Sequence, residues 1–438
     1  MRLAVPIIIG NVGQTLITLT DTIMVGRLGA DSLGAAGFTG GLFFVFMIFG
    51  IGVLAPMSAL FAQSHSRNEH DEGGDLLRHS VVAAVLISVI TMAGLWVMMP
   101  LMGFMGQTAE VVKLSMGFAP YLILSLLPSL LYQAYKQFTD GIGRVKVGMY
   151  VMIVCVLLNI LGNWLFINGH WGFPEMGLNG SGLATLLCRI LMAVMMMAYV
   201  HRHPEFKKYF AQKWRRHIHN VKLKKIFHLG IPNGLTYIFE VGAFTMSSVM
   251  MGWLGSAPLA AHQISLNLAS ISFLVTVGIG AAGTIRVGYE SGLRHFREAR
   301  YAGRVALILG AGYMLFSAVF VFFLREPLAR IYTEDMQVIG YAASFLAVAA
   351  AFQFFDGIQA VAVGILRGLQ DTKWPSVLAF IAYWIIGLPI GYYLAFKLDL
   401  QGPGIWWGLF IGLVFTAIFL TIRFERLSAR KQVPPSEL

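Results

Sequence analysis

Long apolar runs, interrupted by short polar stretches, cover almost the whole 438-residue chain. Most runs are about twenty residues or longer, enough for an α-helix to cross a hydrocarbon core of ~30 Å at ~1.5 Å per residue. The runs predict twelve membrane helices, at residues 3–26, 33–62, 80–103, 115–138, 147–168, 178–200, 228–254, 258–288, 302–324, 338–367, 374–396 and 403–422. We therefore expect an all-α polytopic membrane protein, organised as an N-terminal lobe (1–200), a basic linker (201–227), a C-terminal lobe (228–422) and a tail (423–438).

The two halves of the chain resemble each other at a fixed offset. The first half contains Pro6, Gly26, Leu28, Gly29, Leu33 and Ala35, which return in the second half as Pro232, Gly252, Leu254, Gly255, Leu259 and Ala261. Six helices per half give both halves the same orientation, which is a parallel repeat. Because substrate pathways in duplicated membrane domains lie between the repeats, this pattern indicates a transporter.

Composition and charge support a bilayer as the solvent and predict the orientation. Hydrophobic residues make up 57% of the chain and charged residues 12%, with a mean hydropathy of +0.71; a soluble domain carries roughly twice that charged fraction. Twenty-six of the 32 Lys and Arg residues fall at the N-terminus, in loops after even-numbered helices, or in the tail. This asymmetry predicts that both termini are cytoplasmic. It also accounts for the net charge of +11 through topology and anionic lipid, with no nucleic-acid partner.

Three carboxylates fall inside predicted helices: Glu240 and Asp356 near mid-span, and Asp21 nearer an outer end. A carboxylate at membrane depth costs about 2.5–3.5 kcal/mol on insertion scales, so each requires a reason. Polar residues accompany them at helical spacing, namely Gln14, Thr18, Asn159, Asn163, Asn233, Tyr237, Ser247, Gln263, Asn267, Gln353 and Gln359. These residues have to face the protein interior or water, because lipid cannot satisfy them. They either hydrogen-bond between helices or line an ion and substrate pathway.

The chemistry open to these groups is limited. A buried carboxyl can carry a proton, whereas Glu240 and Asp356 together, with nearby hydroxyls, offer the hard oxygen ligands that Na⁺ needs. The same negative groups would attract an organic cation. His262 is either a proton relay or a hydrogen-bonded structural residue. The sequence has no Walker loop and no clustered Cys/His metal site, so we expect no cofactor and an energy source in an ion gradient or a partner subunit.

Several sequence stretches, spread in order along the chain, resemble the MATE (multidrug and toxic compound extrusion) family, in particular its NorM-type bacterial branch. They are Leu3–Pro6, Asp21–Gly26, Gln137–Gly141, Ala260–Asn267, Gln353–Gln359, Leu366–Lys373 and Gly387–Pro389.

The resemblance implies two six-helix lobes in a V around a central cavity, in the bacterial cytoplasmic membrane. It implies export of organic cations and amphipathic drugs in exchange for Na⁺ or H⁺ by alternating access, without enzymatic activity. Glu240 and Asp356 resemble the acidic pair of the cation site in the C-terminal lobe. The N-terminal-lobe site of the family's other bacterial branch is matched by three residues, Asp21, Asn159 and Thr185.

Two positions depart from the family patterns. Asn163 stands where the other branch has a second aspartate, and Phe352 where a tyrosine can help to bind the ion; both changes remove oxygen ligands. We expect a monomer surrounded by lipid. The alternatives are a flippase for a lipid-linked cargo, an intramembrane enzyme and a passive channel. A flippase would need a wide basic cavity, and Arg189 is the one basic residue well inside a predicted span.

Overall fold

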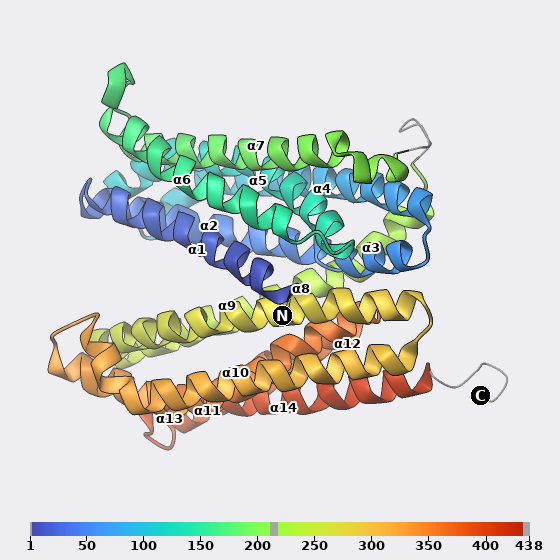
Figure 1. Cartoon of the computed structure of the whole chain (residues 1–438). Coiled ribbons are helices and arrows are strands. Elements are labelled where there is room, and N and C mark those ends of the chain that lie inside the picture. Colours follow the sequence, from blue (N-terminus) through green and yellow to red (C-terminus); the bar gives the residue numbers. More distant parts are fainter. Residues whose placement is uncertain (1, 211–217, 432–438) are drawn as a thin grey trace. The chain divides into compact units, whose positions relative to one another are not determined.

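The computed structural model describes residues 2–210 and 218–431, and every regular element in these ranges is a helix. Figure 1 shows the helices as two bundles. The chain forms two compact units, Met1–Gly234 and Leu235–Leu438, which divide inside helix α8. The all-α fold class predicted from the apolar runs is confirmed.

The first unit is formed by seven helices and the start of an eighth. Their bounds are α1 Ala4–Gly26, α2 Ala30–Leu54, α3 Met57–Ser66, α4 His70–Met98, α5 Ala109–Gly141, α6 Lys146–Asn168, α7 Leu178–Arg202 and α8 Asn220–Leu254. Short 3₁₀ segments follow α4, α6 and α7, at Met99–Phe104 (η1), His170–Gly172 (η2) and Pro204–Tyr209 (η3).

The second unit contains the rest of α8 and six further α-helices. Their bounds are α9 Ser256–Gly292, α10 Phe296–Arg330, α11 Met336–Gly368, α12 Lys373–Phe380, α13 Leu388–Phe396 and α14 Gln401–Arg430. A π-helical segment, η4 (Ile381–Gly387), joins α12 to α13 within one continuous span. Pro389 has no N–H for the usual bond to the carbonyl four residues earlier, which favours this local widening of the helix.

Eleven helices in the described ranges are long and apolar enough to cross a membrane. The remaining predicted span, 228–254, lies in α8 and is not among the eleven. Polar side chains close together in α8, including Asn233, Thr236 and Glu240, lower its hydropathy.

Several helices extend beyond the predicted spans. The span predicted at 80–103 corresponds to a helical run from His70 to Phe104, and the span at 302–324 to Phe296–Arg330. Helical backbone bonding continues past the hydrocarbon core because water solvates charged side chains on the end turns. Acidic residues such as Asp71 and Glu72 also occupy the first turn of α4, where they stabilise the positive end of the helix dipole.

The repeat is visible in the backbone of corresponding turns. Gly29 precedes α2 with φ 109°, and its counterpart Gly255 precedes α9 with φ 124°, a region that favours glycine. Each accepts a hydrogen bond from the leucine four residues later, at 3.1 Å in the first unit and 3.3 Å in the second. The turns before α4 and α10 match in the same way, with φ 60° at Asn68 and 61° at Arg294.

The segment predicted as a linker, 201–227, is partly built into the first unit. Phe206 of η3 is fully buried, and Tyr209 places its hydroxyl 2.7 Å from Nδ1 of His65. Burial raises the pKa of the Tyr209 hydroxyl, which keeps it protonated. Helix α8 begins at Asn220, and Lys222 lies 2.6 Å from carboxylates of both Glu72 and Asp75. The helical start of α8 therefore precedes the predicted boundary at 228.

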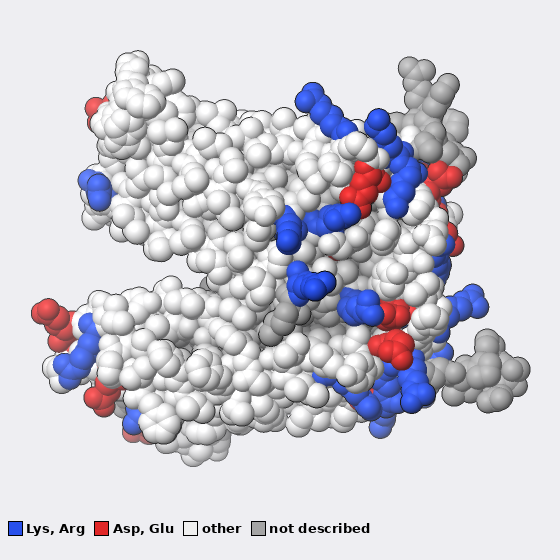
Figure 2. Space-filling view, viewed as in Figure 1, with Lys and Arg blue, Asp and Glu red and all other residues white. Residues whose placement is uncertain are grey.

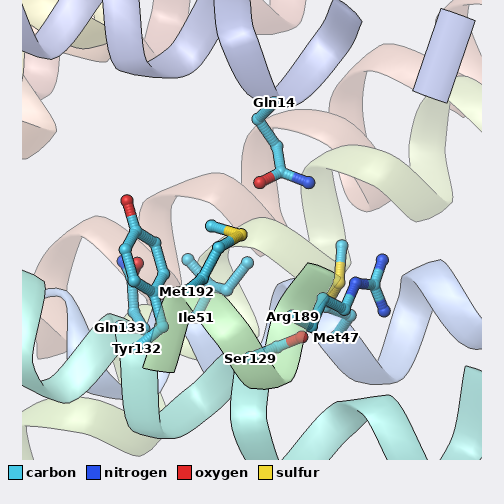
Figure 3. A pocket seen from close by; sticks show the side chains of 8 residues that line it. All are labelled: Gln14, Met47, Ile51, Ser129, Tyr132, Gln133, Arg189 and Met192. Carbon is cyan, nitrogen blue, oxygen red and sulfur yellow. The ribbon is translucent and has the colours of Figure 1, made fainter. Parts of the chain in front are cut away.

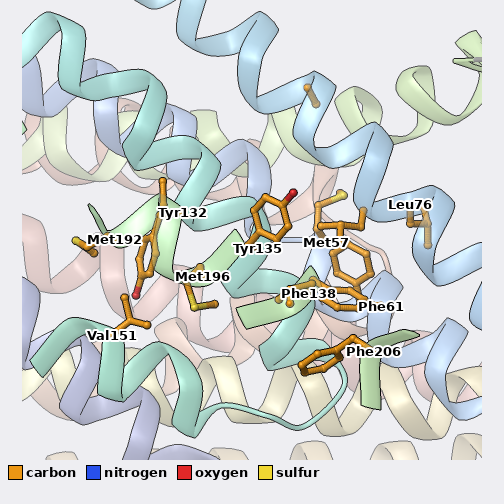
Figure 4. Packing of buried hydrophobic residues seen from close by; sticks show 14 of the residues in the cluster. Met57, Phe61, Leu76, Tyr132, Tyr135, Phe138, Val151, Met192, Met196 and Phe206 are labelled. Atoms are coloured by element: carbon orange, nitrogen blue, oxygen red, sulfur yellow. The ribbon is translucent and has the colours of Figure 1, made fainter. Parts of the chain in front are cut away.

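Aromatic packing joins α3, α5 and η3 of the first unit (Figure 4). Phe138 of α5 contacts Phe61 of α3 edge-on, with ring centroids 5.2 Å apart, and Tyr209 at 5.1 Å. Phe206 completes this cluster at 5.9 Å from Phe138. Edge-to-face pairs of this kind add about 0.5–1.5 kcal/mol each beyond the burial of apolar area.

Glycines allow helices of the second unit to approach closely. A Cβ on Gly364 of α11 would lie 2.5 Å from the carbonyl oxygen of Gly280 in α9. Thr284 donates a hydrogen bond to the Gly364 carbonyl at 2.7 Å in the same contact. A Cβ on Gly408 of α14 would lie 2.4 Å from Cα of Gly391 in α13. Small residues at such contacts are typical of helix association in membranes.

Charged side chains gather toward the helix ends. Figure 2 shows most of the visible Lys and Arg side chains near one end of the helices in each unit, with largely uncharged surface between the ends. Ion pairs tie some of them down, including Arg304 with Glu425 at 2.7 Å and Arg423 with Asp371 at 2.8 Å. Residues 423–430 of the predicted tail thus continue α14, and 432–438 lie outside the described residues.

Candidate ion and substrate sites

In the first unit, three helices bring polar residues together around Asp21. Nδ2 of Asn163 in α6 donates to Oδ1 of Asp21 at 2.5 Å, and the Thr185 hydroxyl in α7 donates to Oδ2 at 3.1 Å. Nδ2 of Asn163 also donates to Oδ1 of Asn159 at 3.3 Å. Asp21 is partly buried, and these donors suit an ionised carboxylate.

Two polar atoms of this cluster have no hydrogen-bond partner among the described residues. They are Oδ1 of Asn163 and Nδ2 of Asn159, and both are buried. A buried amide group without a partner costs about 1–3 kcal/mol. Asn159 Nδ2 is near enough to Asp21 to interact with its carboxylate, so the buried Oδ1 of Asn163 is the acceptor of this cluster that lacks a partner among the described residues.

In the second unit, Glu240 of α8 and Asp356 of α11 are close enough to interact electrostatically. Asp356 is 6% exposed and Glu240 is partly buried. Both carboxylates also interact electrostatically with Tyr383 of the π-helical segment. The Tyr383 hydroxyl donates a hydrogen bond to Oε1 of Gln359 at 2.8 Å. Two carboxylates in one buried site either share a proton or hold a cation between them.

Hydroxyl and amide groups lie one turn from Asp356. Gln353 is 1% exposed, and its Oε1 accepts from the Ser317 hydroxyl of α10 at 3.3 Å. Ser317 in turn lies 2.6 Å from the Ser272 hydroxyl of α9. Nε2 of Gln353 has no partner in the described part of the chain. These groups extend the polar interior of the unit between α9, α10 and α11.

Other residues predicted to support this site lie elsewhere in the unit. Tyr237 accepts a hydrogen bond from Nη2 of Arg367 at 3.2 Å. Gln263 and Asn267 are exposed; Gln263 contacts Ser248 at 3.4 Å, and Asn267 donates to the Gln263 carbonyl at the same distance. The structure therefore places these two amides on a surface of α9 rather than in the buried cluster.

His262 is fully buried beside Trp406, with ring centroids 5.5 Å apart. Neither ring nitrogen has a hydrogen-bond partner among the described residues. Both interpretations of His262, a proton relay and a hydrogen-bonded structural residue, therefore stay predictions.

A small cavity of about 40 Å³ lies within the first unit (Figure 3). Its walls come from α1, α2, α5 and α7, and are formed by Gln14, Met47, Ile51, Ser129, Tyr132, Gln133, Arg189 and Met192. Figure 3 shows the Gln14 amide on one side of the space, with Arg189, Met47 and Ser129 across from it.

Sequence reasoning did not single out Tyr383, Ser317 or Ser272 as site residues. Tyr383 lies in an otherwise apolar span, where a lone tyrosine is typical of packing or an interface. The nearby Gly387 and Pro389 were the available signal, because breaks in helical bonding often mark functional positions. Ser272 and Ser317 lie on different helices, and their pairing has no signature in linear spacing.

Comparison with known proteins identifies the family. The MatE family model matches residues 6–165 and again residues 232–393. The two matches begin at Pro6 and Pro232, the first pair of the internal repeat, and together they span most of the chain. The chain belongs to the MatE family.

Relatives that match nearly the whole chain share one name. The chain is 36% identical over 444 residues to the "Probable multidrug resistance protein NorM" of Rhizobium meliloti (strain 1021), covering 100% of this chain and 94% of the relative. It is 34% identical to the protein of that name from Brucella suis biovar 1 (strain 1330), covering 97% and 92%. These comparisons make the chain a transporter rather than an enzyme.

The fold agrees with solved structures. The crystal structure of the eukaryotic MATE transporter AtDTX14 matches 98% of this chain and 97% of its own, with a TM-score of 0.87 at 20% identity. At this identity, the likeness concerns the fold.

Proposed function

We propose that this protein is a multidrug efflux antiporter of the bacterial cytoplasmic membrane. It exports organic cations and amphipathic drugs in exchange for Na⁺ or H⁺ by alternating access. The observation that carries this proposal is the pair formed by buried Asp356 and partly buried Glu240, on two helices of the second unit and close enough to interact electrostatically. The names of the NorM relatives support multidrug resistance as its role.

The mechanism is competition for negative charge. An organic cation is attracted by ionised Glu240 and Asp356, whereas a proton or Na⁺ bound at the pair cancels that attraction. Because the two ligands favour different charge states of one site, each lowers the affinity for the other. This coupling is reciprocal, so the inward ion gradient drives cargo release outward.

Other oxygen atoms near Glu240 and Asp356 support the binding of a small cation by these two carboxylates. Tyr383 uses its proton to bond Gln359, which leaves the phenolic oxygen as an acceptor near both carboxylates. Phe352, one turn before Asp356, contributes no oxygen. In this proposal Tyr383 supplies the aromatic hydroxyl that Phe352 lacks.

The Asp21 cluster is the second ion or cargo site. Asn163 and Thr185 hold the carboxylate as an acceptor, and Asn159 lies beside them. We place both termini in the cytoplasm, from the distribution of Lys and Arg. The functional unit is a monomer, since the duplicated chain supplies both six-helix repeats itself.

The test uses purified protein in proteoliposomes with rhodamine 123, a permanently cationic dye. The Glu240→Gln and Asp356→Asn double variant is expected to reduce ion-driven dye transport to the level of protein-free liposomes. The matched control is Glu334→Gln, an exposed carboxylate between α10 and α11, which is expected to transport at the wild-type rate. Full transport by the double variant would remove the pair from the mechanism.

The same liposomes identify the ion. A Na⁺ gradient and a pH gradient are imposed separately, and the gradient that moves the dye names the coupling ion. Movement without either gradient would indicate a passive channel. A lack of response to both would favour a flippase.

A further inference from the structure

Arg189 lies near the middle of α7, where the cost of a charge in the membrane is high. Its Nη1 donates to the Ser125 hydroxyl of α5 at 2.6 Å, and its guanidinium carbon lies 4.8 Å from the centroid of the Phe43 ring. Within the described ranges, no ion pair to Arg189 accompanies these contacts. Neither contact supplies a negative charge to cancel that of the guanidinium.

Ser125 does not substitute for an anion. Its hydroxyl donates to the Leu122 carbonyl at 2.6 Å, so towards Arg189 it is a neutral acceptor. A guanidinium has five N–H donors arranged to bind a carboxylate through two parallel hydrogen bonds. The structure therefore leaves Arg189 with a charge that an anionic ligand would stabilise.

The cavity of Figure 3 gives such a ligand access to the side chain. Its volume of about 40 Å³ accommodates a few atoms, since one water needs roughly 10–15 Å³ on this measure. Two wall hydroxyls are already engaged within the protein: Ser129 donates to the Ser125 carbonyl at 2.7 Å and Tyr132 to the Gly148 carbonyl at 3.4 Å. Among the described residues that line the wall, Arg189 is the only charged one.

A negative group lies close to this positive one. Thr185, which donates to Asp21, precedes Arg189 by four residues on α7, a rise of about 6 Å. Asp21 and Arg189 interact electrostatically without forming an ion pair. The first unit therefore presents a carboxylate that is bonded to Thr185 and a guanidinium whose residue lies four positions further along the same helix.

We propose that Arg189 and its cavity form a subsite for the carboxylate of a zwitterionic cargo, whose cationic part is drawn toward Asp21. This inference rests on the proposed export function and narrows its substrate class. It gives the protein a preference for amphiphiles that carry both charges over those that carry the positive charge alone. The competing role for Arg189 is purely structural, tying α7 to α5 and α2.

A pair of dyes separates the two roles. Rhodamine 123 is the methyl ester of rhodamine 110, so the two differ in one free carboxylate. Their Kd values are measured on purified protein by fluorescence anisotropy. Arg189→Gln is expected to raise the Kd of rhodamine 110 by about tenfold or more, because a charge-assisted hydrogen-bonded pair is lost. The same substitution is expected to lower the Kd of rhodamine 123, because a charge that repels this cationic dye is removed.

The control is Arg27→Gln, an exposed arginine after α1 of the same unit, for which the ratio of the two Kd values should equal that of the wild type. A parallel change of both Kd values in Arg189→Gln, or no change in either, would overturn the proposal.

A second measurement needs no mutation and so does not depend on the variant folding. Benzoate, a simple carboxylate, is titrated against each dye on the wild-type protein. It is expected to displace rhodamine 110 and to leave rhodamine 123 bound; equal displacement of both dyes, or of neither, contradicts the carboxylate subsite. Transport of rhodamine 123 in proteoliposomes tests the export function independently, so the two failures are distinguishable.

Discussion

Asp21 and Asp356 have different neighbours, and this difference decides what each carboxylate can do. Asp21 accepts hydrogen bonds from Asn163 and Thr185 and has no second carboxylate among these partners. Asp356 faces a second carboxylate, Glu240, which favours uptake of a positive charge between them. We infer that the pair in the second unit responds more strongly to the coupling ion.

At the residue scale, Tyr383→Phe should weaken ion coupling. The substitution removes the hydroxyl that bonds Gln359 and lies near both carboxylates, at a cost of about 1 kcal/mol. The affinity for the coupling ion is expected to fall by roughly five- to tenfold, measured from the ion concentration at half-maximal dye release. Tyr393→Phe, an exposed tyrosine in the same span, is the matched control and should behave as the wild type. Equal values for Tyr383→Phe and wild type would exclude Tyr383 from the site.

His262 provides a prediction about stability. Because both ring nitrogens are buried without partners among the described residues, His262→Leu should remove a desolvation cost and raise the free energy of unfolding by about 1 kcal/mol. The measurement is the thermal midpoint in detergent, alongside dye transport. A higher midpoint with normal transport fits a packing role. Loss of transport in a stable variant would instead support the proton relay.

At the scale of helices, close contacts through glycine decide how α9 and α11 pack. A Cβ atom on Gly364 would overlap the backbone of α9 at Gly280. Backbone atoms cannot move aside without displacing the helix. The apolar pattern predicts that both segments are helices. It does not predict which glycine lies in the contact, because α11 also carries Gly340, where a Cβ would meet nothing within 4 Å.

Gly364→Ala should therefore destabilise the protein, by about 1–3 kcal/mol for overpacking. Gly340→Ala is the matched control in the same helix, since a Cβ there has no neighbour within 4 Å. That substitution should be neutral or stabilise by up to about 1 kcal/mol through helix propensity. Thermal midpoints of the two variants check the prediction, and equal midpoints would contradict the contact.

At the scale of the whole molecule, the distribution of Lys and Arg predicts one topology for both halves. Glu69, between α3 and α4, should be cytoplasmic, and Glu334, between α10 and α11, should face the opposite side. Single cysteines at these positions report this in intact cells through a membrane-impermeant maleimide. Cys155 and Cys188 are buried and should give little background. Labelling of Glu69→Cys, but not of Glu334→Cys, from outside would show that the orientation is opposite to the predicted one.

The sequence by itself determined the helical fold class, the order and approximate positions of the apolar spans, and the repeat between the two halves. Hydrocarbon thickness sets the length of each apolar run, and the cost of a buried charge makes residues such as Glu240 and Asp356 conspicuous. A pattern along the chain is sufficient for both properties, since each depends on one helix at a time.

Only the tertiary structure decided which polar residues meet. It joined Asp21 to Asn163 and Thr185 from three helices, added Tyr383 to the acidic pair through a π-helical segment, and placed Gln263 and Asn267 on an exposed face. It also left Arg189 beside a cavity without an ion pair in the described ranges. Such contacts depend on how helices rotate and pack against one another, which glycine contacts and local breaks in helical bonding determine and linear spacing does not encode.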